Sequence, residues 1–338
     1  MRTRPGQAVD PRYAAFAGAR VLITGGLGFI GANLARRLVE LGSDVLLIDS
    51  LVPEYGGNLF NIADIADRVT VNVSDIRDTH GLRFLLRERD FLFNLAGQTS
   101  HLDSMVDPLV DLEINCRSQL TLLEACREVN PGINVVFAST RQIYGRPDYV
   151  PVDETHILRP VDVNGVNKMA GEAYHTLYHD VYGLRCCALR LTNTYGPRMR
   201  IKDARQTFVG VWLRAVIEER GFEVWGGDQL RDFTYVDDAV DAFLLAALTP
   251  ELAGKACNIG GHGAVSLHDL AATLIAANGG GSFVVREFPA ERKRIDIGDY
   301  YAEDKLFRSL TGWTPRTDLR SGLTQSLVFF RENLSHYV

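Results

Sequence analysis

A glycine-rich turn lies near the N-terminus of this chain, between an apolar run and a helical pattern. Residues 21–23 form a short apolar run typical of a buried strand, and glycines follow at 25, 28 and 31. Apolar residues then recur at helical spacing over residues 29–41, until Gly42 ends the pattern. A second apolar run, residues 45–48, leads to Asp49. This order predicts a strand, a tight turn, a helix and a second strand that ends in a carboxylate.

Each part of this unit has a physical role in binding a dinucleotide. Gly25 permits the tight turn, Gly28 lets a pyrophosphate approach the helix N-terminus, and Gly31 allows the helix to pack closely on the strand. A carboxylate at Asp49 accepts hydrogen bonds from an adenosine ribose and repels a 2′-phosphate. The unit therefore indicates a dinucleotide site that favours NAD over NADP.

The alternation of strands and helices continues along the chain and then weakens. Strands are expected over 69–73, 91–97, 133–138 and 186–191, and helices over 79–88, 108–129 and 167–181. This pattern predicts an α/β fold with a Rossmann-like, doubly wound parallel sheet. Less regular elements follow, with helices expected over 206–219, 237–248, 266–278 and 317–333. We expect a leader over 1–19, an NAD-binding domain over 20–195, and a mainly substrate-binding lobe over 196–338 that interleaves with the first domain.

Composition excludes several classes of protein. The 338 residues are 46% hydrophobic and 23% charged, as in globular proteins, and the net charge of −6 argues against a general nucleic-acid binder. No apolar run reaches membrane-spanning length. The five cysteines form no CxxC pair, and His175 and His179 lack a third metal ligand, so we expect no metal site. Free thiols favour a reducing, cytoplasmic location.

Five motifs, the glycine turn among them, carry a resemblance to a known family. They are residues 24–31, 94–98, 139–145, 193–198 and 231–238, in that order along the chain. Together they resemble the extended short-chain dehydrogenase/reductases, and within these the nucleotide-sugar epimerases, dehydratases and decarboxylases. The resemblance covers roughly residues 20 to 330.

The resemblance implies a set of site residues. In that family a tyrosine takes a proton from a sugar hydroxyl while NAD takes the hydride, beside a serine or threonine and a lysine. Thr140 and Lys168 fill two of these places, and Asn164 stands where the tyrosine is expected. The residues implied to bind NAD are Gly25, Gly28, Phe29, Ile30, Gly31, Asp49, Ser50, Asp75, Ile76, Leu95, Ala96, Gly97 and Lys168.

The replacement of the tyrosine by Asn164 leaves three possibilities open. An amide has no proton to exchange near neutral pH, so Asn164 cannot be the general base. A substitute base could be Tyr144, His101 or Asp103; the chemistry could avoid a tyrosine-driven oxidation; or the protein could bind a nucleotide sugar without turnover. If Asn164 is a simple loss, the Asn164→Tyr substitution should raise the rate of oxidation.

The substrate side departs from the family at two more positions. Where the related dehydratases carry Asp-Glu after the threonine, this chain has Arg141 and Gln142, so ordinary 4,6-dehydration is disfavoured. Arg141 is suited to an anionic group of the substrate. The resemblance assigns substrate contacts to these two residues and to Asn193, Arg231 and Arg292.

The resemblance therefore implies an NAD-dependent epimerase of a nucleotide-diphosphate sugar, acting at C4 of a hexose or hexuronate. A decarboxylase or another oxidoreductase of such sugars is the alternative from the same fold, and a non-catalytic NAD- and nucleotide-sugar-binding protein is the alternative from another class. The family also implies a homodimer, through helices that match residues 108–129 and 167–182.

Overall fold

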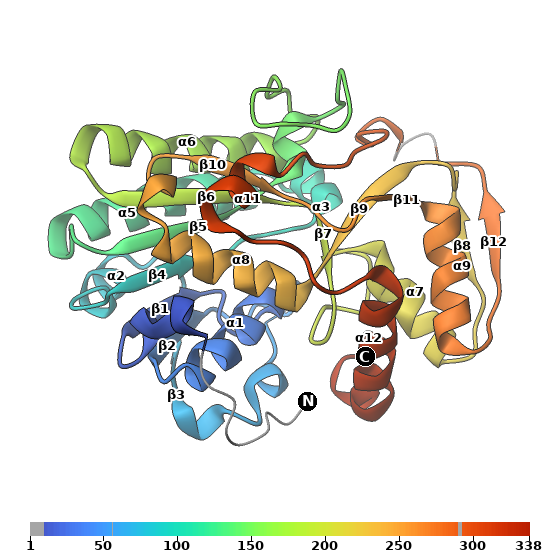
Figure 1. Cartoon of the computed structure of the whole chain (residues 1–338), viewed down its shortest axis with the longest axis horizontal. Helices are drawn as coiled ribbons and strands as arrows, with labels where there is room; N and C mark the ends of the chain where they lie inside the picture. The colour runs from blue at the N-terminus through green and yellow to red at the C-terminus, as the bar shows by residue number, and fades with distance from the viewer. Residues whose placement is uncertain (1–9, 56, 290–292) are drawn as a thin grey trace.

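The computed structural model describes residues 10–55, 57–289 and 293–338 (Figure 1). The elements of the first half are β1 (Arg20–Thr24), α1 (Phe29–Glu40), β2 (Asp44–Asp49), β3 (Val69–Val73), α2 (Thr79–Leu85), β4 (Phe91–Asn94), α3 (His101–Val106), α4 (Pro108–Leu112), α5 (Ser118–Val129), β5 (Asn134–Thr140), α6 (Val163–Tyr182) and β6 (Arg185–Leu191). Those of the second half are β7 (Asn193–Tyr195), α7 (Phe208–Ile217), β8 (Phe222–Trp225), β9 (Leu230–Tyr235), α8 (Val236–Leu248), β10 (Ala256–Ile259), β11 (Ala264–Ser266), α9 (Leu267–Asn278), β12 (Phe283–Arg286), α11 (Lys305–Thr311) and α12 (Leu319–Asn333).

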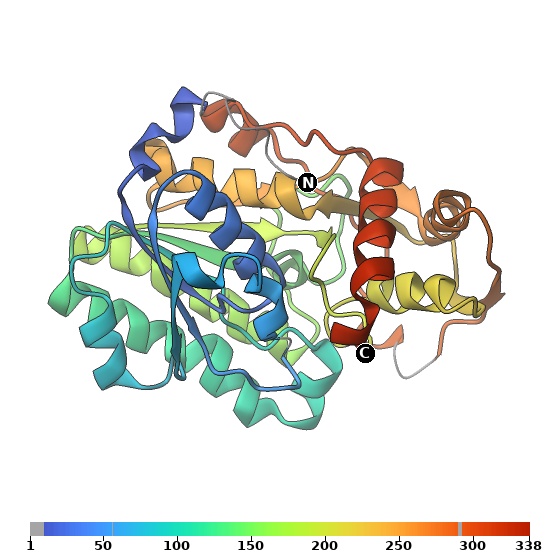
Figure 2. The same ribbon diagram turned by 90° about the horizontal axis from the view of Figure 1, so that it is seen from below.

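The centre of the molecule is a seven-stranded sheet in the order β10-β6-β5-β4-β1-β2-β3. Every neighbouring pair in it is parallel. One face packs against α1 and α8, and the other packs against α2, α5 and α6 (Figures 1 and 2). Because both faces are covered, the inner strands β1, β2 and β4 are apolar and buried along most of their length. The expected Rossmann-like α/β fold is confirmed.

The chain after β6 contributes to both parts of the molecule. It adds β10 to the edge of the large sheet and α8 to one of its faces. The remaining strands form a three-stranded sheet (β11-β9-β7) and a two-stranded sheet (β12-β8). These two sheets share an apolar core with α7, α9 and α12, to one side of the large sheet in Figure 1. The change of pattern near residue 195 is therefore not a clean boundary in space.

Two helices of the first half differ from the expected spans. The helix expected from residue 167 begins at Val163, where the Asp162 side chain accepts a hydrogen bond from Gly165 N at 2.7 Å and so caps the helix. The helix expected over 108–129 is interrupted by a π-helical turn, Glu113–Arg117. Both differences lie beside the candidate site, where π turns are common.

The described residues that precede β1 pack against the rest of the fold. Pro11–Phe16 forms a 3₁₀ helix, and its Tyr13 and Phe16 side chains are buried in the core with α1 and α8. The described residues before β1 therefore belong to the packed fold.

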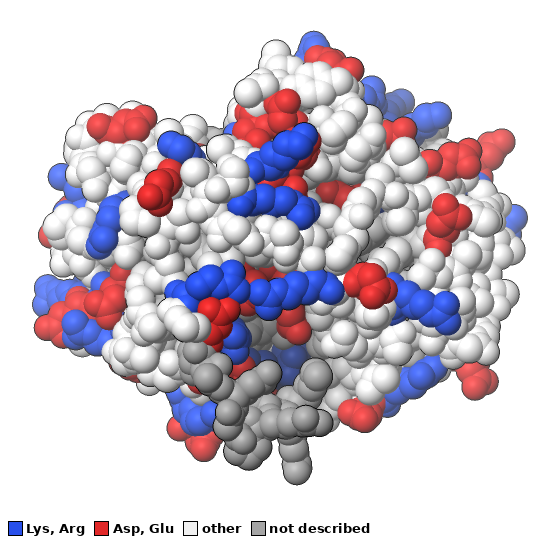
Figure 3. Space-filling view, in the orientation of Figure 1, with Lys and Arg blue, Asp and Glu red and all other residues white. Residues whose placement is uncertain are grey.

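On the face seen in Figure 3, acidic and basic side chains lie in small groups among other residues, which make up most of the visible surface. Within the described ranges, no helix is both long and apolar enough to cross a membrane. The same residues contain no group of three or more His, Cys, Asp or Glu side chains arranged to hold a metal ion.

Candidate functional site

Most of the residues singled out from the sequence meet in one cleft at the carboxyl ends of the central strands. Those that line it are Gly25, Gly28, Phe29, Ile30, Gly31, Asp49, Ser50, Asp75, Ile76, Leu95, Ala96, Gly97, Thr140, Arg141, Asn164, Lys168 and Asn193. This is the edge at which open parallel sheets bind their ligands. Gln142 and Arg231 do not line the cleft, and Arg292 lies outside the described residues.

The glycine turn leaves room that a side chain would fill. Gly25 has a φ of +67°, and a Cβ added to it would lie 2.9 Å from the backbone nitrogen of Ala96. A Cβ on Gly31 would lie 2.9 Å from the Cα of Gly26 and would overlap the carbonyl oxygen of Gly25. The N-terminus of α1 carries no side-chain cap, so its backbone N–H groups face the cleft as an anion site. This cradle fits the pyrophosphate of a dinucleotide.

Asp49 ends β2 on the same side of the cleft. Its carboxylate accepts hydrogen bonds from Leu27 N at 3.0 Å and Leu51 N at 2.9 Å, which fix its position beside the glycine turn. Burial raises the pKa of this carboxyl, and the two backbone donors partly oppose the rise. The position suits hydrogen bonding to a ribose.

Lys168 is buried where β4, β5 and α6 meet. Its Nζ donates to the carbonyl oxygen of Ala138 at 3.2 Å and lies 4.9 Å from the centre of the Phe137 ring. Burial lowers the pKa of Lys168 to about 8, although the nearby Asp111 carboxylate opposes the shift. A Cβ on Gly97 would lie 2.9 Å from Nζ, so the glycine leaves space for the ammonium group.

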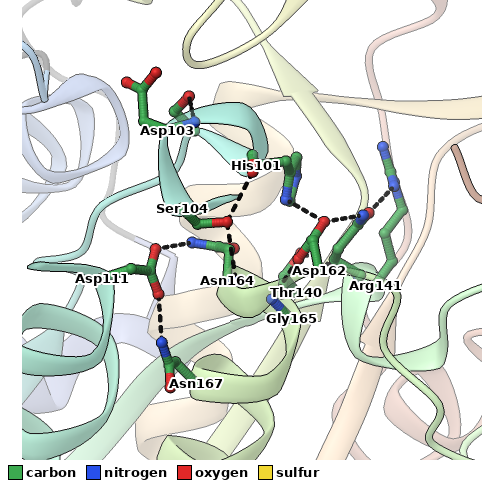
Figure 4. A network of polar contacts seen from close by, with 12 residues as sticks. His101, Asp103, Ser104, Asp111, Thr140, Arg141, Asp162, Asn164, Gly165 and Asn167 are labelled. Carbon is green, nitrogen blue, oxygen red and sulfur yellow. Dashed lines mark hydrogen bonds and ion pairs between the residues drawn. The ribbon is translucent and has the colours of Figure 1, made fainter. Parts of the chain in front are cut away.

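Asn164 belongs to a cluster of amides around one buried carboxylate (Figure 4). The Asp111 side chain accepts from the Nδ2 atoms of Asn115 and Asn164, each at 3.0 Å, and of Asn167 at 2.8 Å. Asn164 Nδ2 also donates to the carbonyl oxygen of Gln98 at 2.8 Å. The amide is therefore an integral part of a polar network, and the π turn presents Asn115 to the same network.

Two of the three candidate bases are occupied by other contacts. The Tyr144 hydroxyl is fully buried, accepts from Arg190 at 2.6 Å and donates to Asn258 at 2.8 Å, and burial raises its pKa to about 12. Asp103 does not line the cleft and forms an ion pair with Arg205 at 2.7 Å. His101 does line the cleft.

Arg141 and Gln142 take different directions after β5. Arg141 lines the cleft, donates to Asn193 Oδ1 at 2.8 Å, and has its pKa lowered by burial. The Gln142 side chain is buried and donates to Asp162 Oδ2 at 2.7 Å. The cleft wall thus presents a cation at the position where the related dehydratases carry a carboxylate.

Arg231 is tied into the small lobe. It donates to the carbonyl oxygens of Leu230 and Gly298 and pairs with Asp296 at 3.0 Å, and burial lowers its pKa to about 10. Its neighbour Asp232 is also buried, which raises the pKa of that carboxyl to about 7. These contacts leave Arg231 short of the cleft in this structure.

Sequence reasoning missed two acidic residues that organise the site, Asp111 and Asp162. The sequence does carry a signal for Asp162, because an aspartate directly before the first apolar residue of a helix, here Val163, is a typical N-cap. Asp111 carried no such signal, since its three amide partners come from two different helical segments.

Comparison with known proteins agrees with this geometry. Residues 21–260 match the model of the NAD dependent epimerase/dehydratase family. The chain is 31% identical over 315 residues to UDP-glucose 4-epimerase of Mycolicibacterium smegmatis, covering 92% of this chain and 98% of the relative. It is 30% identical to the putative UDP-glucose 4-epimerase of Methanocaldococcus jannaschii, and the alignment covers 93% of this chain and 99% of the relative.

A solved structure gives the same result for the fold. The crystal structure of the UDP-glucose 4-epimerase of Thermotoga maritima with UDP-glucose superposes with a TM-score of 0.85 at 28% identity, covering 93% of this chain and 99% of that one. With the family match over more than half of the sequence, the glycine cradle and the parallel sheet, the chain belongs to the NAD-dependent epimerase/dehydratase family.

Proposed function

We propose that the protein is an NAD-dependent epimerase of a nucleotide-diphosphate sugar, with C4 of a hexose or hexuronate as the altered carbon. The observation that carries the proposal is that one cleft joins the glycine cradle, Lys168 and Thr140. A dinucleotide in the cradle would extend toward the end of β5, where Thr140 stands. The family membership supports the cofactor and the class of substrate.

Different residues of the cleft would bind the cofactor and the substrate. Bound NAD would supply the hydride acceptor and would later return the hydride to the oxidised carbon. Gly28 and the N-terminus of α1 would hold the pyrophosphate, and Asp49 would hold the adenosine ribose. Lys168 would hold the nicotinamide ribose with its ammonium group. The Thr140 hydroxyl accepts from Gln142 N at 3.2 Å, which leaves its own proton free to donate to a sugar oxygen.

Arg141 supports recognition of an anionic substrate group. Its guanidinium lines the cleft beside Thr140 and is steadied by Asn193. Such a group binds carboxylates and phosphates through paired N–H donors. A hexuronate carboxylate or the nucleotide diphosphate would meet this requirement.

Two alternatives have specific support. A decarboxylase or another sugar oxidoreductase would use the same cleft, with Arg141 facing the substrate carboxylate. A non-catalytic binding protein would explain Asn164, because its amide cannot exchange a proton with the substrate.

One experiment separates the three. The purified protein with NAD is incubated with UDP-, dTDP-, GDP- and CDP-linked hexoses and hexuronates, and the products are identified by NMR and mass spectrometry. Epimerisation gives a product of unchanged mass with an inverted carbon, and decarboxylation gives a product that has lost carbon dioxide. Binding of a nucleotide sugar without any product would refute the enzymatic proposal.

We also propose a homodimer through α5 and α6. Large apolar side chains are exposed along the segments expected to pair, among them Leu112, Leu120, Leu177 and Val181. Charged substitutions Leu177→Glu and Val181→Glu should give a monomer by light scattering, whereas Val328→Glu, at an exposed site on α12, should not. A monomeric wild type at micromolar concentration would contradict the dimer.

A further inference from the structure

His101 and Asp162 meet at the edge of the cleft, although 61 positions separate them in the sequence. His101 is the first residue of α3, and Asp162 caps the N-terminus of α6. The His101 Nδ1 atom lies 3.1 Å from Asp162 Oδ2, and Figure 4 shows the ring turned toward the carboxylate. The Asp162 side chain is fully buried, whereas that of His101 is 38% exposed. One member of the pair is therefore fixed and the other reaches the cleft.

Asp162 is held as a carboxylate by its surroundings. Oδ1 accepts from Gly165 N and Oδ2 accepts from Gln142 Nε2, both at 2.7 Å. Burial alone would raise the pKa of the Asp162 carboxyl, but the His101 ring and these two donors outweigh burial and lower the pKa below its usual value. A fixed, ionised carboxylate beside an imidazole favours the proton on Nδ1 and leaves Nε2 as the basic atom.

The contact joins His101 to the Thr140 side of the cleft. Gln142 bonds to Asp162 through its side chain and to the Thr140 hydroxyl through its backbone nitrogen. No described residue makes a hydrogen bond to His101 Nε2. The His101 Nδ1 atom is buried and lies within hydrogen-bond distance of Asp162 Oδ2, but the angle between the two groups does not meet that of a hydrogen bond. A small rotation of the imidazole ring would bring its Nδ1–H into line with the carboxylate.

We infer that His101 is the proton-transfer residue in place of the missing phenol, and that Asp162 is its positioning residue. The inference rests on the proposed function. In the forward step His101 Nε2 would take the proton of the sugar hydroxyl, while the C–H bond of the same carbon breaks and its hydride passes to bound NAD, so that the carbinol becomes a carbonyl. In the return step the sugar would turn the other face of its carbonyl to the cofactor, the carbonyl carbon would take the same hydride back, and His101 would give its proton back to the oxygen. Atoms and charges balance without another reactant.

The first test uses chemical rescue. We expect His101→Ala to slow the reduction of bound NAD by a nucleotide sugar by about 10²–10⁴-fold, the usual worth of general-base catalysis, with the affinity for NAD unchanged. Added imidazole should restore part of the rate, because the half-exposed site admits it. His80→Ala, an exposed histidine on α2, should leave the rate unchanged. A His101→Ala rate within threefold of wild type, or a slow variant that imidazole fails to rescue, overturns the inference.

The second test examines Asp162 and needs no turnover. Asp162→Asn keeps a good N-cap for α6 but removes the charge that orients the ring. Nitrogen NMR of the His101 ring should show the proton on Nδ1 in the wild type and a loss of this preference in Asp162→Asn. A wild-type ring with its proton on Nε2 overturns the inference even if the protein is an active epimerase. If no nucleotide sugar is converted while the ring shows the expected tautomer, the proposed function fails and the base assignment fails with it.

Discussion

The two sides of the cleft follow the family to different degrees. The cofactor side (Gly25, Gly28, Gly31, Asp49, Gly97 and Lys168) retains every residue that the family resemblance predicts. On the substrate side the threonine is kept as Thr140, whereas Asn164 replaces the expected tyrosine, and Arg141 and Gln142 replace the Asp-Glu pair of the related dehydratases. A dinucleotide cradle depends on the shape of the backbone and on the absence of side chains, so few substitutions preserve it. Proton transfer, by contrast, needs only one suitably placed acceptor atom, which a residue on another element of the fold can supply.

The largest effect on the cofactor side is expected at Gly31. An alanine there would place its Cβ 2.9 Å from the Gly26 Cα and against the Gly25 carbonyl. We expect Gly31→Ala to lose about 1–3 kcal/mol of unfolding free energy, as in overpacked sites. NAD affinity should fall by about a hundredfold, or about 2.7 kcal/mol. Calorimetric titration and urea denaturation measure both.

The matched control is Gly132→Ala, because nothing lies within 4 Å of a Cβ there. Its unfolding free energy should stay within about 0.5 kcal/mol of wild type. Equal effects at the two glycines would mean that the cradle does not depend on close packing.

A substitution of Lys168 tests how much the burial of its ammonium group lowers the free energy of unfolding. Its pKa is lowered from 10.5 to about 8 by burial, so the unfolded chain binds more protons than the folded one between these pH values. This group therefore makes the wild type more stable as pH rises through that window, by up to about 3 kcal/mol. Urea denaturation across the window should show this gain relative to Lys168→Met. Lys202→Met, at an exposed lysine, should track the wild type. A pH-independent difference between wild type and Lys168→Met would contradict the burial of a charged ammonium.

Asp49 tests the selectivity of the cofactor side. Asn has nearly the same shape but no charge to repel a 2′-phosphate. We expect Asp49→Asn to narrow the preference for NAD over NADP by about tenfold, or about 1.4 kcal/mol. Fluorescence titration with the two cofactors measures the ratio. Asp44→Asn, at the exposed start of the same strand, is the control, and an unchanged ratio in Asp49→Asn would remove the aspartate from cofactor selection.

The sequence predicts the cofactor side of the cleft better than the substrate side. The glycine turn and Asp49 lie within one short strand–helix–strand unit, so their spacing alone predicts how they meet. The pair of His101 and Asp162 comes from separate helices, and its meeting depends on how α3 packs against α6. No local pattern encodes such a contact.

The predicted start of α6 is wrong by one helical turn, and this changes the roles of the residues around it. Gly165 lies inside the helix and lowers the helix propensity of this segment, so the sequence pattern predicts a start at Asn167. The observed start at Val163 makes Asp162 a cap and places Asn164 one turn before Lys168 on the same helix. Arg231 differs from its expected role for a tertiary reason, since Asp296 and two carbonyl groups from the small lobe bind it.

A substitution at Asn164 distinguishes a site that has lost its tyrosine without replacement from a site in which other residues have taken over the role of the tyrosine. If Asn164 is a simple loss, the sequence alone predicts that restoring a tyrosine raises the rate of oxidation. In the structure the Asn164 amide donates to both Asp111 and Gln98, and a phenol cannot make both bonds. We therefore expect Asn164→Tyr to leave the buried Asp111 carboxylate short of one donor and to disturb the substrate side.

The most direct test is the absorbance of reduced nicotinamide after rapid mixing of the NAD-loaded protein with the nucleotide sugar that it converts. The wild type should give a transient rise, and Asn164→Tyr should give a slower one although it binds NAD as tightly. No rise in the wild type, or a faster rise in Asn164→Tyr, would contradict a substrate side rebuilt around the amide and the histidine.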